Sequence, residues 1–434
     1  MSGSRNFIVR SVGCKVNQAE AGALAHGLEA MGWMQRGFEP RLVVVFTCSV
    51  TARAAADSRR IVRTAVRDWP GAVVVATGCD AQLNPGSYQP HARVLPRAWL
   101  AKAPWMLAEG GLEPVDGPMP PPESGPFCPG MIMPGAGRSR AFFKIQDGCD
   151  SRCGYCVVPL ARGRARSLTV DEAVAGWQQL GMAGAQEVVL TGIHLGQWGL
   201  DLPGQPTLEW LLRALLAAHP GPRLRLSSLE CRELTPGLIR LVASNSRICA
   251  HLHVPLQTGS ARLLEAMGRE YSPEEYAQVL EAAAGAIEGV CIGADVIVGL
   301  PGEQEEDFRA TYELIKRLPI AYLHVFPYSP RPGTEAERMG GRVDSAVVKA
   351  RAKALRELGV LKREQFYTEQ VGRVLEVVGE QKGIGHSDNY CVVRADRALR
   401  AGERVWVEVE GVEQEEGGVV LVGRVVGRHN AAAF

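Results

Sequence analysis

The sequence predicts an α/β protein with an N-terminal parallel-sheet α/β domain, a partial (β/α)6 barrel and a small C-terminal β-barrel. Runs of β-branched residues alternate with helix-like stretches on both sides of a Pro/Gly-rich segment, and the helical patterns stop near residue 370. These composition changes place the domains at 1–110, 140–368 and 369–434, with a linker at 111–139. A chain of 434 residues that is 46% hydrophobic is long enough for several cores.

The first domain is expected to hold three buried strands, at residues 7–12, 41–47 and 72–78. Helical patterns at 18–33 and 51–69 separate them, and this alternation is typical of βαβ units with a parallel sheet. The segment 111–139 is dense in Pro and Gly and shows neither a helical nor a strand period, so it reads as a linker.

The second domain repeats the alternation on a larger scale. Its expected strands lie at 141–146, 187–192, 224–228, 251–255, 293–299 and 321–326. Six βα units predict an incomplete barrel, whose chemistry should lie at the carboxyl ends of the strands. The expected strands of the third domain lie at 373–380, 389–395, 403–412 and 418–427. Four or five short strands with Gly turns predict a small β-barrel.

Composition indicates the cellular compartment of the protein and the role of its cysteines. The N-terminus has no signal-peptide pattern and no apolar run approaches the length of a membrane span, so we expect a cytoplasmic protein without a membrane partner. The formal net charge is only +1, but basic residues outnumber acidic ones by 13 to 7 in residues 1–110 and by 7 to 2 in 138–166. Eleven cysteines in a reducing compartment indicate metal ligands or buried side chains rather than disulfides.

Three cysteines of the first domain each follow a predicted strand. Cys14, Cys48 and Cys79 come after "FIVRSVG", "RLVVVFT" and "AVVVATG". Because parallel strands end at one edge of a sheet, we expect the three thiols to converge although some 30 residues separate them in sequence. The alternative is three ordinary buried cysteines that lie beside strands by chance.

A second set of three cysteines is local. Cys149, Cys153 and Cys156 form C-x3-C-x2-C directly after the first barrel strand. Thiolates select zinc or iron–sulfur clusters, and a structural zinc site would require a fourth protein ligand that is not found nearby. A cluster held by three cysteines leaves one iron open to a small molecule. A zinc site or a ferredoxin-like cluster remains the alternative.

The C-x3-C-x2-C spacing, with Tyr155 before the last cysteine, resembles the radical S-adenosylmethionine (SAM) superfamily. Over nearly its whole length the chain is similar to the methylthiotransferase family, on the segments "GCKVNQAE", "FTCSV", "TGC", "KIQDGCDSRCGYCVVPLARGRARS", "LTGIHLG", "RLSSLE", "HLHVPLQTGSARLLEAMGREY", "ADVIVGLPGE" and "FPYSPRPGTEA". The resemblance implies a domain with an auxiliary cluster, a radical SAM barrel and an RNA-binding TRAM β-barrel.

The same resemblance implies two [4Fe-4S] clusters and SAM as cofactors. Cys149, Cys153 and Cys156 would hold the cluster that cleaves SAM, and Cys14, Cys48 and Cys79 the auxiliary cluster that carries the sulfur. One SAM would donate a methyl group to that sulfur, and a second would yield the radical that removes hydrogen from an unactivated C–H bond. An electron donor such as flavodoxin or ferredoxin is implied, and the sulfur source is unknown.

Further positions are candidates for contacts with SAM. They lie beside the local cysteines or at strand ends: Tyr155, Thr191, Gly192, Ser228 and Glu230. For the strand-end residues the alternative is ordinary capping. His251 and His253 share one face of a short strand and are expected to pack or to form hydrogen bonds rather than to bind a metal.

A basic stripe is expected on the helix after Cys48, formed by Arg53, Arg60 and Arg67 with Arg59 and Arg63 beside them. It is either a phosphate-binding surface or an ordinary solvated helix face. Three further arginines after the local cysteines would extend it, namely Arg162, Arg164 and Arg166.

The segments "GCKVNQ", "PLARGRARS" and "RLSSLE" look most like the branch that acts on the anticodon stem-loop of tRNA, where it converts N6-threonylcarbamoyladenosine (t6A) at position 37 to its 2-methylthio form. Leu160 departs from that pattern, since an aromatic residue is common there. Isopentenyladenosine in tRNA and an aspartate of a ribosomal protein are the alternative substrates within the family. A nucleic-acid-binding protein with structural clusters, or a radical SAM enzyme with a non-RNA substrate, are alternatives outside it.

Overall fold

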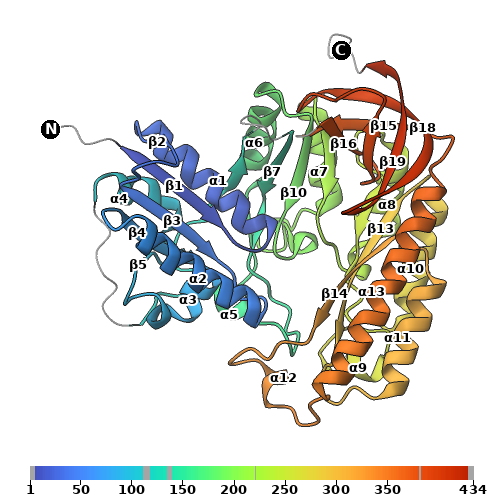
Figure 1. Ribbon diagram of the computed structural model, residues 1–434, viewed down its shortest axis with the longest axis horizontal. Coiled ribbons are helices and arrows are strands. Elements are labelled where there is room, and N and C mark those ends of the chain that lie inside the picture. The colour runs from blue at the N-terminus through green and yellow to red at the C-terminus, as the bar shows by residue number, and fades with distance from the viewer. Residues whose placement is uncertain (1–4, 111–117, 134–138, 220, 381–382, 429–434) are drawn as a thin grey trace.

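The computed structural model describes residues 5–110, 118–133, 139–219, 221–380 and 383–428. Figure 1 shows three units in chain order: an α/β unit at the N-terminus, a central barrel surrounded by helices, and a small β-barrel near the C-terminus. The predicted fold class is confirmed. Among the described residues no helix combines the length and the apolar character that a membrane span requires.

The N-terminal unit is a five-stranded parallel sheet in the order β2-β1-β3-β4-β5. Its strands are β1 (Asn6–Ser11), β2 (Met34–Gln35), β3 (Leu42–Thr47), β4 (Val73–Gly78) and β5 (Arg93–Val94). Its helices are α1 (Lys15–Ala30), α2 (Ala52–Asp68), α3 (Cys79–Leu83) and α4 (Ala103–Ala108), with 3-10 turns η1 (Pro85–Ser87) and η2 (Arg97–Lys102). The three long strands lie where the sequence predicts them: β3 and β4 are mostly buried runs rich in valine, whereas β1 is buried only at its start and exposed at its end.

The structure contains a strand near the C-terminal end of the predicted linker. Residues 130–132 form strand β6 (Gly130–Ile132), which pairs antiparallel with the first barrel strand and packs against α1. A strand of three residues leaves no detectable period in a Pro/Gly-rich segment. Residues 111–117 and 134–138 of the predicted linker lie outside the described residues.

The central unit contains the six predicted parallel strands in two sheets, β11-β10-β7-β6 and β12-β13-β14, joined by isolated bridges between Leu224 and Ile248 and between Ser228 and His253. The strands are β7 (Arg140–Lys144), β10 (Glu187–Thr191), β11 (Arg223–Leu226), β12 (His251–His253), β13 (Cys291–Val298) and β14 (Tyr322–Pro327), with β8 (Gln146–Asp147) and β9 (Arg166–Ser167) as a short extra pair. No strand pairing closes the barrel between β6 and β14 in the described chain.

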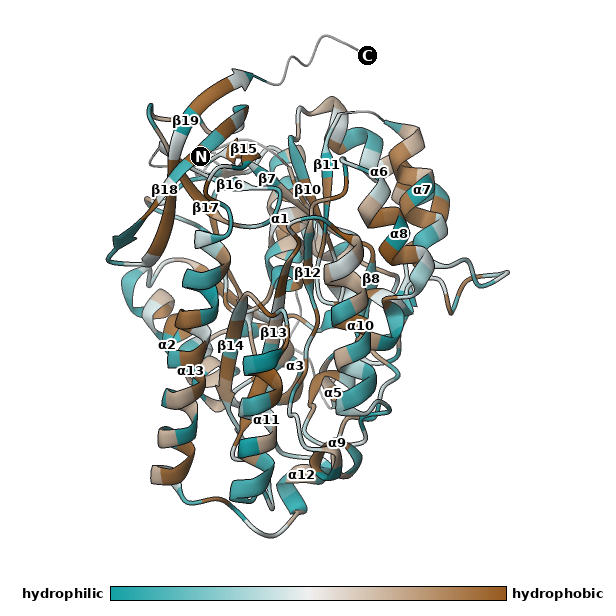
Figure 2. Ribbon diagram, turned by 90° about the vertical axis from the view of Figure 1, so that its right-hand side faces the viewer, coloured by the Kyte–Doolittle hydropathy of each residue, from teal (hydrophilic) through white to brown (hydrophobic). Residues whose placement is uncertain are grey.

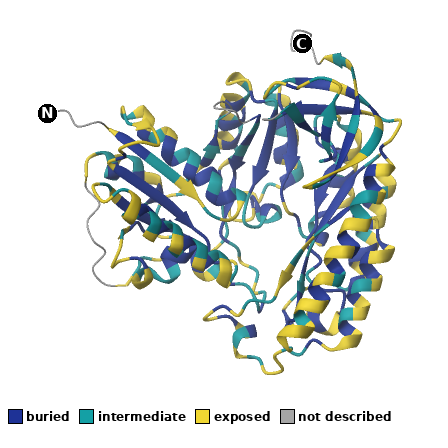
Figure 3. Ribbon diagram, viewed as in Figure 1, coloured by how far each residue is buried: buried dark blue, intermediate teal, exposed yellow. Residues whose placement is uncertain are grey.

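Helices cover the outside of this barrel. They are α6 (Val170–Met182), α7 (Leu208–Ala218), α8 (Pro236–Ser244), α10 (Pro273–Ala286), α11 (Glu305–Arg317) and α13 (Ser345–Thr368), with η3 (Leu195–Gln197) and η4 (Cys231–Glu233). Helix α5 (Val158–Arg162) instead contacts α3 of the N-terminal unit, and α9 (Ala261–Ala266) and α12 (Glu335–Arg338) contribute to a small separate apolar cluster. The apolar sides of the covering helices and the outward residues of the strands form the largest core, whereas the inward side chains are mostly polar. The helices alternate apolar and polar stretches (Figure 2), and α10, α11 and α13 expose their outer faces (Figure 3).

The C-terminal unit is a closed barrel in the order β15-β16-β17-β19-β18. Its strands are β15 (Val374–Gly379), β16 (Ile384–Ser387), β17 (Val392–Ala395), β18 (Arg404–Glu415) and β19 (Gly418–Arg428). Four of the five were predicted. The unit contacts the amino ends of the central strands, where Arg223 and Arg225 donate to backbone carbonyls of Glu376, His386, Ser387 and Asp388.

Candidate active site

The three dispersed cysteines meet at one edge of the N-terminal sheet. Strands β1, β3 and β4 are adjacent and parallel, and Cys48 and Cys79 directly follow β3 and β4. Cys14 is the N-cap residue of α1, shortly after β1. The charges of Cys14 and Cys79 both act on Cys48, and burial is the main reason that the pKa of the Cys48 thiol rises to about 12. The expected convergence is therefore observed.

The backbone at this edge depends on Gly13, which has a φ of +93°. A Cβ atom at that position would lie 2.6 Å from the Cys48 sulfur, so only glycine lets the chain before Cys14 approach the second thiol so closely.

The local cysteines form a tight loop after β8. The Cys149 amide donates to the carbonyl of Gly163 at 3.1 Å, and the Cys156 amide donates to the carbonyl of Cys153 at 2.9 Å. The charges of Cys149 and Cys153 act on Cys156, whose pKa rises to about 12 chiefly through burial. The loop therefore gathers three thiols beyond the carboxyl end of β7, where barrel chemistry is expected.

Neither set of three is spaced for a single metal ion. A site for one metal ion needs ligand atoms that lie close together. In the described chain the side chains of His253, Asp295 and His324 have ligand atoms within 4.8 Å of one another, and this group contains no cysteine. Thiolates on one zinc ion at about 2.3 Å would have to lie within roughly 4.6 Å of one another. A cluster spreads its thiolates over separate irons, so the wider spacing fits an iron–sulfur cluster better than zinc.

Two polar side chains that the sequence analysis did not single out contact the local cysteines. His194 Nδ1 lies 3.3 Å from the Cys149 sulfur, and its Nε2 lies 2.5 Å from Glu233. Arg269 donates to the Cys153 sulfur at 3.2 Å and also to Glu230. Both lie in segments that carried the family resemblance, "LTGIHLG" and "EAMGREY", but no spacing rule connects them to the cysteines.

These contacts oppose the effect of burial on the ionisable groups. Burial alone would lower the pKa of His194, yet its hydrogen bonds to Cys149 and Glu233 raise it to about 10. Burial alone would raise the pKa of Cys149, yet the hydrogen bond to His194 lowers it. The arrangement favours a thiolate, the form that binds metal.

The predicted SAM contacts lie in different surroundings. Glu230 is joined to the local cysteines through Arg269. Thr191 is buried at the end of β10, and a Cβ on the following Gly192 would lie 2.9 Å from Gln146, so the backbone approaches closely there. Ser228 is exposed beside β12, whereas Tyr155 packs against an apolar cluster around Met267.

A buried ion network lies between the two sets of cysteines. We call it the interdomain network; its members are Glu20, Arg97, Lys144, Asp147 and Arg162. Glu20 lies on α1, and the two carboxylates share three cations at distances of 2.7 to 3.2 Å. These ion pairs connect the N-terminal unit to the barrel.

Arg162 links this network to the dispersed cysteines. Its guanidinium donates to the Cys79 sulfur at 3.2 Å, to Asn17 at 2.7 Å and to Asp147 at 2.7 Å. Since α5, which ends at Arg162, begins directly after the local loop, one short helix connects both sets of cysteines. The prediction that Arg162 extends a surface stripe is wrong, because its side chain is fully buried.

Only some of the other predicted arginines lie on the surface. Arg164 is exposed, but Arg166 donates to the carbonyl of Gly125 in the predicted linker. On α2, Arg53, Arg60 and Arg67 are exposed and each lies near an aspartate of the same helix. Arg59 instead pairs at 3.2 Å with buried Asp80 and so does not belong to the exposed stripe.

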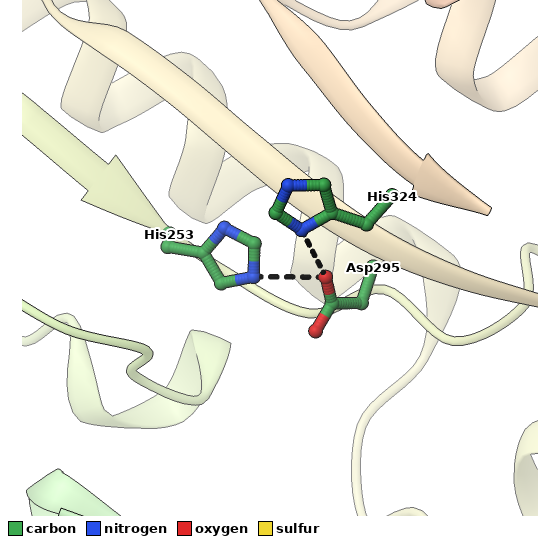
Figure 4. A group of neighbouring side chains, drawn as sticks. All are labelled: His253, Asp295 and His324. Atoms are coloured by element: carbon green, nitrogen blue, oxygen red, sulfur yellow. Dashed lines mark hydrogen bonds and ion pairs between the residues drawn. The ribbon is translucent and has the colours of Figure 1, made fainter. Parts of the chain in front are cut away.

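The inner histidines form hydrogen bonds, as expected. Tyr322 Oη lies 2.9 Å from His251 Nε2 and 3.1 Å from His253 Nδ1. Asp295 Oδ1 lies 3.0 Å from both His253 Nε2 and His324 Nδ1 (Figure 4). Burial alone would raise the pKa of Asp295, but the hydrogen bonds from the two histidines hold it well below its ordinary value.

Comparison with known proteins agrees with this geometry. The family profile described as the radical SAM superfamily matches residues 143–315, and one described as uncharacterized protein family UPF0004 matches residues 6–94. Among solved structures, a radical SAM methyltransferase from Kitasatospora setae, TsrM, superposes with a TM-score of 0.54 over 77% of each chain. At 17% identity this likeness supports the fold alone.

Curated relatives match nearly the whole chain. The threonylcarbamoyladenosine tRNA methylthiotransferase MtaB of Aquifex aeolicus is 33% identical over 92% of this chain and 98% of its own length. The protein of the same name from Bacillus subtilis is 34% identical over 88% of both chains. A tRNA-2-methylthio-N(6)-dimethylallyladenosine synthase from Sphingopyxis alaskensis is 32% identical over 87% of both. The chain belongs to the methylthiotransferase family of radical SAM enzymes, which use SAM and two [4Fe-4S] clusters.

Proposed function

We propose that the enzyme inserts a methylthio group at carbon 2 of t6A at position 37 of tRNA. The observation that carries the proposal is the arrangement of six cysteines in two sets joined by Arg162. The choice of t6A is supported by two relatives named for that substrate, which are 33% and 34% identical to the chain, against 32% for a relative named for dimethylallyladenosine.

The residues present fit two clusters. We assign Cys149, Cys153 and Cys156 to the cluster that binds SAM, and Cys14, Cys48 and Cys79 to the auxiliary cluster. Each set supplies three thiols, and neither has the close spacing of a single-ion site. When bound, the clusters and SAM supply the cleavage of the C–H bond and the methylthio group, a step that no side chain could perform as an acid or base.

The protein's own residues position these groups. His194 and Arg269 donate toward the sulfurs of Cys149 and Cys153, and this stabilises the charged thiolates. Glu230, beside Arg269, is suited to bind the ammonium of SAM, as are the backbone groups of Thr191 and Gly192. Ser228 and Tyr155 remain predicted SAM contacts.

The tRNA would meet several parts of the chain. We infer that the exposed arginines of α2 contact phosphates and that the C-terminal barrel acts as a TRAM domain. A tRNA substrate is consistent with a cytoplasmic enzyme reduced by flavodoxin or ferredoxin. The boundaries 1–110, 140–368 and 369–434 remain our proposed domains.

The test uses anaerobically reconstituted protein with reductant, SAM and tRNA that carries t6A, followed by nucleoside mass spectrometry. We expect a nucleoside heavier by one methylthio group. Cys153→Ala should abolish both this product and 5'-deoxyadenosine, whereas Cys48→Ala should abolish the product and retain 5'-deoxyadenosine. Cys128→Ala, which changes a cysteine outside both sets, is the matched control.

The same assay separates the alternatives. Modification of isopentenyladenosine tRNA but not of t6A tRNA would overturn the choice of branch. Formation of 5'-deoxyadenosine without change in either tRNA would overturn tRNA as the substrate and direct the search to a ribosomal-protein aspartate.

A further inference from the structure

Three neighbouring strands of the central unit each contribute one polar side chain to a common group. His253 ends β12, Asp295 lies in β13 and His324 lies in β14 (Figure 4). Asp295 and His324 are directly opposite each other in the register of their strands. His253 is opposite Gly293, two positions before Asp295. Because side chains alternate along a strand, the three residues share one face of the sheet.

That face is the inner side of the barrel. Leu323 of β14 lies against α13, where a Cβ on Gly359 would be 3.2 Å from it, so the next residue, His324, points the opposite way. The side chains are 10% exposed at His253, 25% at Asp295 and 53% at His324. No strand pairing joins β14 to β6 within the described residues. An ion from solvent can therefore reach the group at this open edge of the barrel.

The distances within the group suit a single metal ion. Asp295 Oδ1 lies 3.0 Å from His253 Nε2 and 3.0 Å from His324 Nδ1, and the ligand atoms of all three lie within 4.8 Å of one another. Nitrogen and oxygen ligands that share one ion at about 2.1 Å are separated by roughly 3.0–3.4 Å in octahedral or tetrahedral geometry. Two imidazoles and one carboxylate are a ligand set of catalytic zinc and non-haem iron sites.

The charge of Asp295 is not matched by a lysine or an arginine. Among the described residues its ion-pair partners are two imidazoles, whereas buried Glu20 and Glu187 each pair with arginines at 2.7 to 3.2 Å. Burial acts to raise the pKa of Asp295, but the hydrogen bonds from both histidines keep it below its ordinary value, so the carboxylate is ionised at neutral pH. A divalent cation would supply the missing positive charge.

Tyr322 fixes the orientation of His253. Its Oη lies 3.1 Å from His253 Nδ1 and 2.9 Å from His251 Nε2. The Tyr322 ring lies over β13 because position 293 is glycine, where a Cβ would lie 2.0 Å from that ring. An imidazole that binds a metal through one nitrogen usually donates its other N–H to a fixed acceptor. Tyr322 provides this acceptor for Nδ1 and leaves Nε2 free to bind an ion.

We propose that His253, Asp295 and His324 bind one divalent transition-metal ion, such as Zn²⁺ or Fe²⁺, that is separate from the two clusters. The site goes beyond the proposed function, because it uses no cysteine of either set and its occupation requires no tRNA. The hydrogen bonds of the metal-free group are compatible with it: the ion replaces the proton between Asp295 and each imidazole, and each imidazole then carries its proton on the opposite nitrogen. Three protein ligands leave open positions that an oxygen or nitrogen atom of a bound molecule can fill.

The experiment measures Co²⁺ binding to the anaerobically reconstituted enzyme with oxidised clusters. Co²⁺ accepts the same nitrogen and oxygen ligands as Zn²⁺ and has an EPR signal, whereas oxidised [4Fe-4S] clusters have none. Equilibrium dialysis gives the affinity and the stoichiometry, pulsed EPR detects imidazole nitrogens bound to the ion, and iron analysis reports the clusters. The variants are Asp295→Asn, His324→Asn and Tyr322→Phe. His26→Asn, the same change at an exposed histidine of α1, is the matched control.

We expect the wild type and His26→Asn to bind about one Co²⁺ per chain through imidazole nitrogen. Zn²⁺ should displace the ion, whereas Mg²⁺, which prefers oxygen ligands, should not. Asp295→Asn and His324→Asn each alter a ligand and should weaken binding by more than about 100-fold at an unchanged iron content. Tyr322→Phe should weaken it by about 10-fold, because it removes only the oxygen that orients His253.

Three outcomes would overturn the inference. The first is Co²⁺ binding that is no tighter in the wild type than in Asp295→Asn and His324→Asn. The second is a bound ion with sulfur rather than imidazole ligands, which would place it at the cysteines. The third is a parallel loss of Co²⁺ and cluster iron in the variants, which would make the group structural. Since this assay contains no tRNA, its result is independent of the nucleoside assay that tests the proposed function.

Discussion

Two buried carboxylates face three buried cations at the carboxyl end of the central strands, and the same number of charges recurs at the amino end. The first set is the interdomain network. The second, which we call the C-terminal network, consists of Glu187, Arg223, Arg225, Glu376 and Arg404. Each has one positive charge more than it has negative charges, so each must place that charge against another acceptor.

The two networks use different acceptors. In the C-terminal network, arginines donate to backbone carbonyls such as those of His386 and Ser387, which are always present once the barrel has folded. In the interdomain network, Arg162 donates to the sulfur of Cys79. The C-terminal network is thus complete in the polypeptide, whereas the interdomain network is matched to an anionic thiolate and, on our assignment of Cys79, to a loaded cluster.

The largest effect is expected for Arg162→Met. The change removes the charged hydrogen bonds that Arg162 donates to Asp147, Glu20 and Asn17 in a fully buried site, which should cost about 3–5 kcal/mol of stability, and it removes the donor to Cys79. Urea unfolding followed by tryptophan fluorescence, together with iron analysis, should show a less stable protein that has lost auxiliary-cluster iron. Exposed Arg164→Met should change neither quantity. Full iron retention in Arg162→Met would contradict the link between network and cluster.

Glu187→Gln tests the C-terminal network and should cost about 3 kcal/mol at neutral pH without loss of iron. Burial alone would raise the pKa of Glu187, but the charges of Arg225 and Arg223 hold it well below its ordinary value. The stabilisation is therefore fully present above the unfolded-state pKa of about 4.3 and is lost as the pH falls through the lower folded-state value.

This sign predicts that the stability difference between wild type and Glu187→Gln stays constant from pH 7 to about pH 5 and shrinks below about pH 4. Urea titrations at several pH values measure it. A difference that grows on acidification would mean that Glu187 is protonated in the folded protein.

Asp295→Asn addresses the hydrogen-bonded group of His253, Asp295 and His324 in Figure 4. Asp295 accepts hydrogen bonds from two imidazoles and pairs with no arginine among the residues that the structure describes, so we expect a smaller cost of about 1–2 kcal/mol. The readout is again urea unfolding, with Asp171→Asn on exposed α6 as the control. A cost as large as that of Glu187→Gln would show that burial, rather than the number of charges, dominates.

The smallest effect on stability is expected for the double change Arg53→Gln and Arg60→Gln. Both arginines are exposed, and their pairs with Asp57 should contribute less than about 0.5 kcal/mol. If they contact phosphates, the slope of log affinity for tRNA against log salt concentration should decrease by about 1–2. Filter binding at several salt concentrations measures the slope. An unchanged slope would show that the stripe is a solvated helix face that does not contact tRNA phosphates.

The sequence by itself determined the order of the three units and the grouping of the six cysteines. Both follow from local rules. Buried strands are often runs of β-branched residues, parallel strands end at the same edge of a sheet, and the C-x3-C-x2-C motif is contiguous in the sequence. These features depend on neighbours along the chain, so tertiary structure was not needed to find them.

Only the tertiary structure decided which charges are buried and what they contact. Arg162 reads as one more surface arginine, yet it reaches Asn17 across 145 positions of sequence. His194 and Arg269 carry no periodicity that could reveal their partners, and three-residue β6 is visible only because β7 lies beside it. Such contacts form between surfaces that meet only after each unit has folded. The hydrophobic periodicity of one segment does not identify the segment that packs against it.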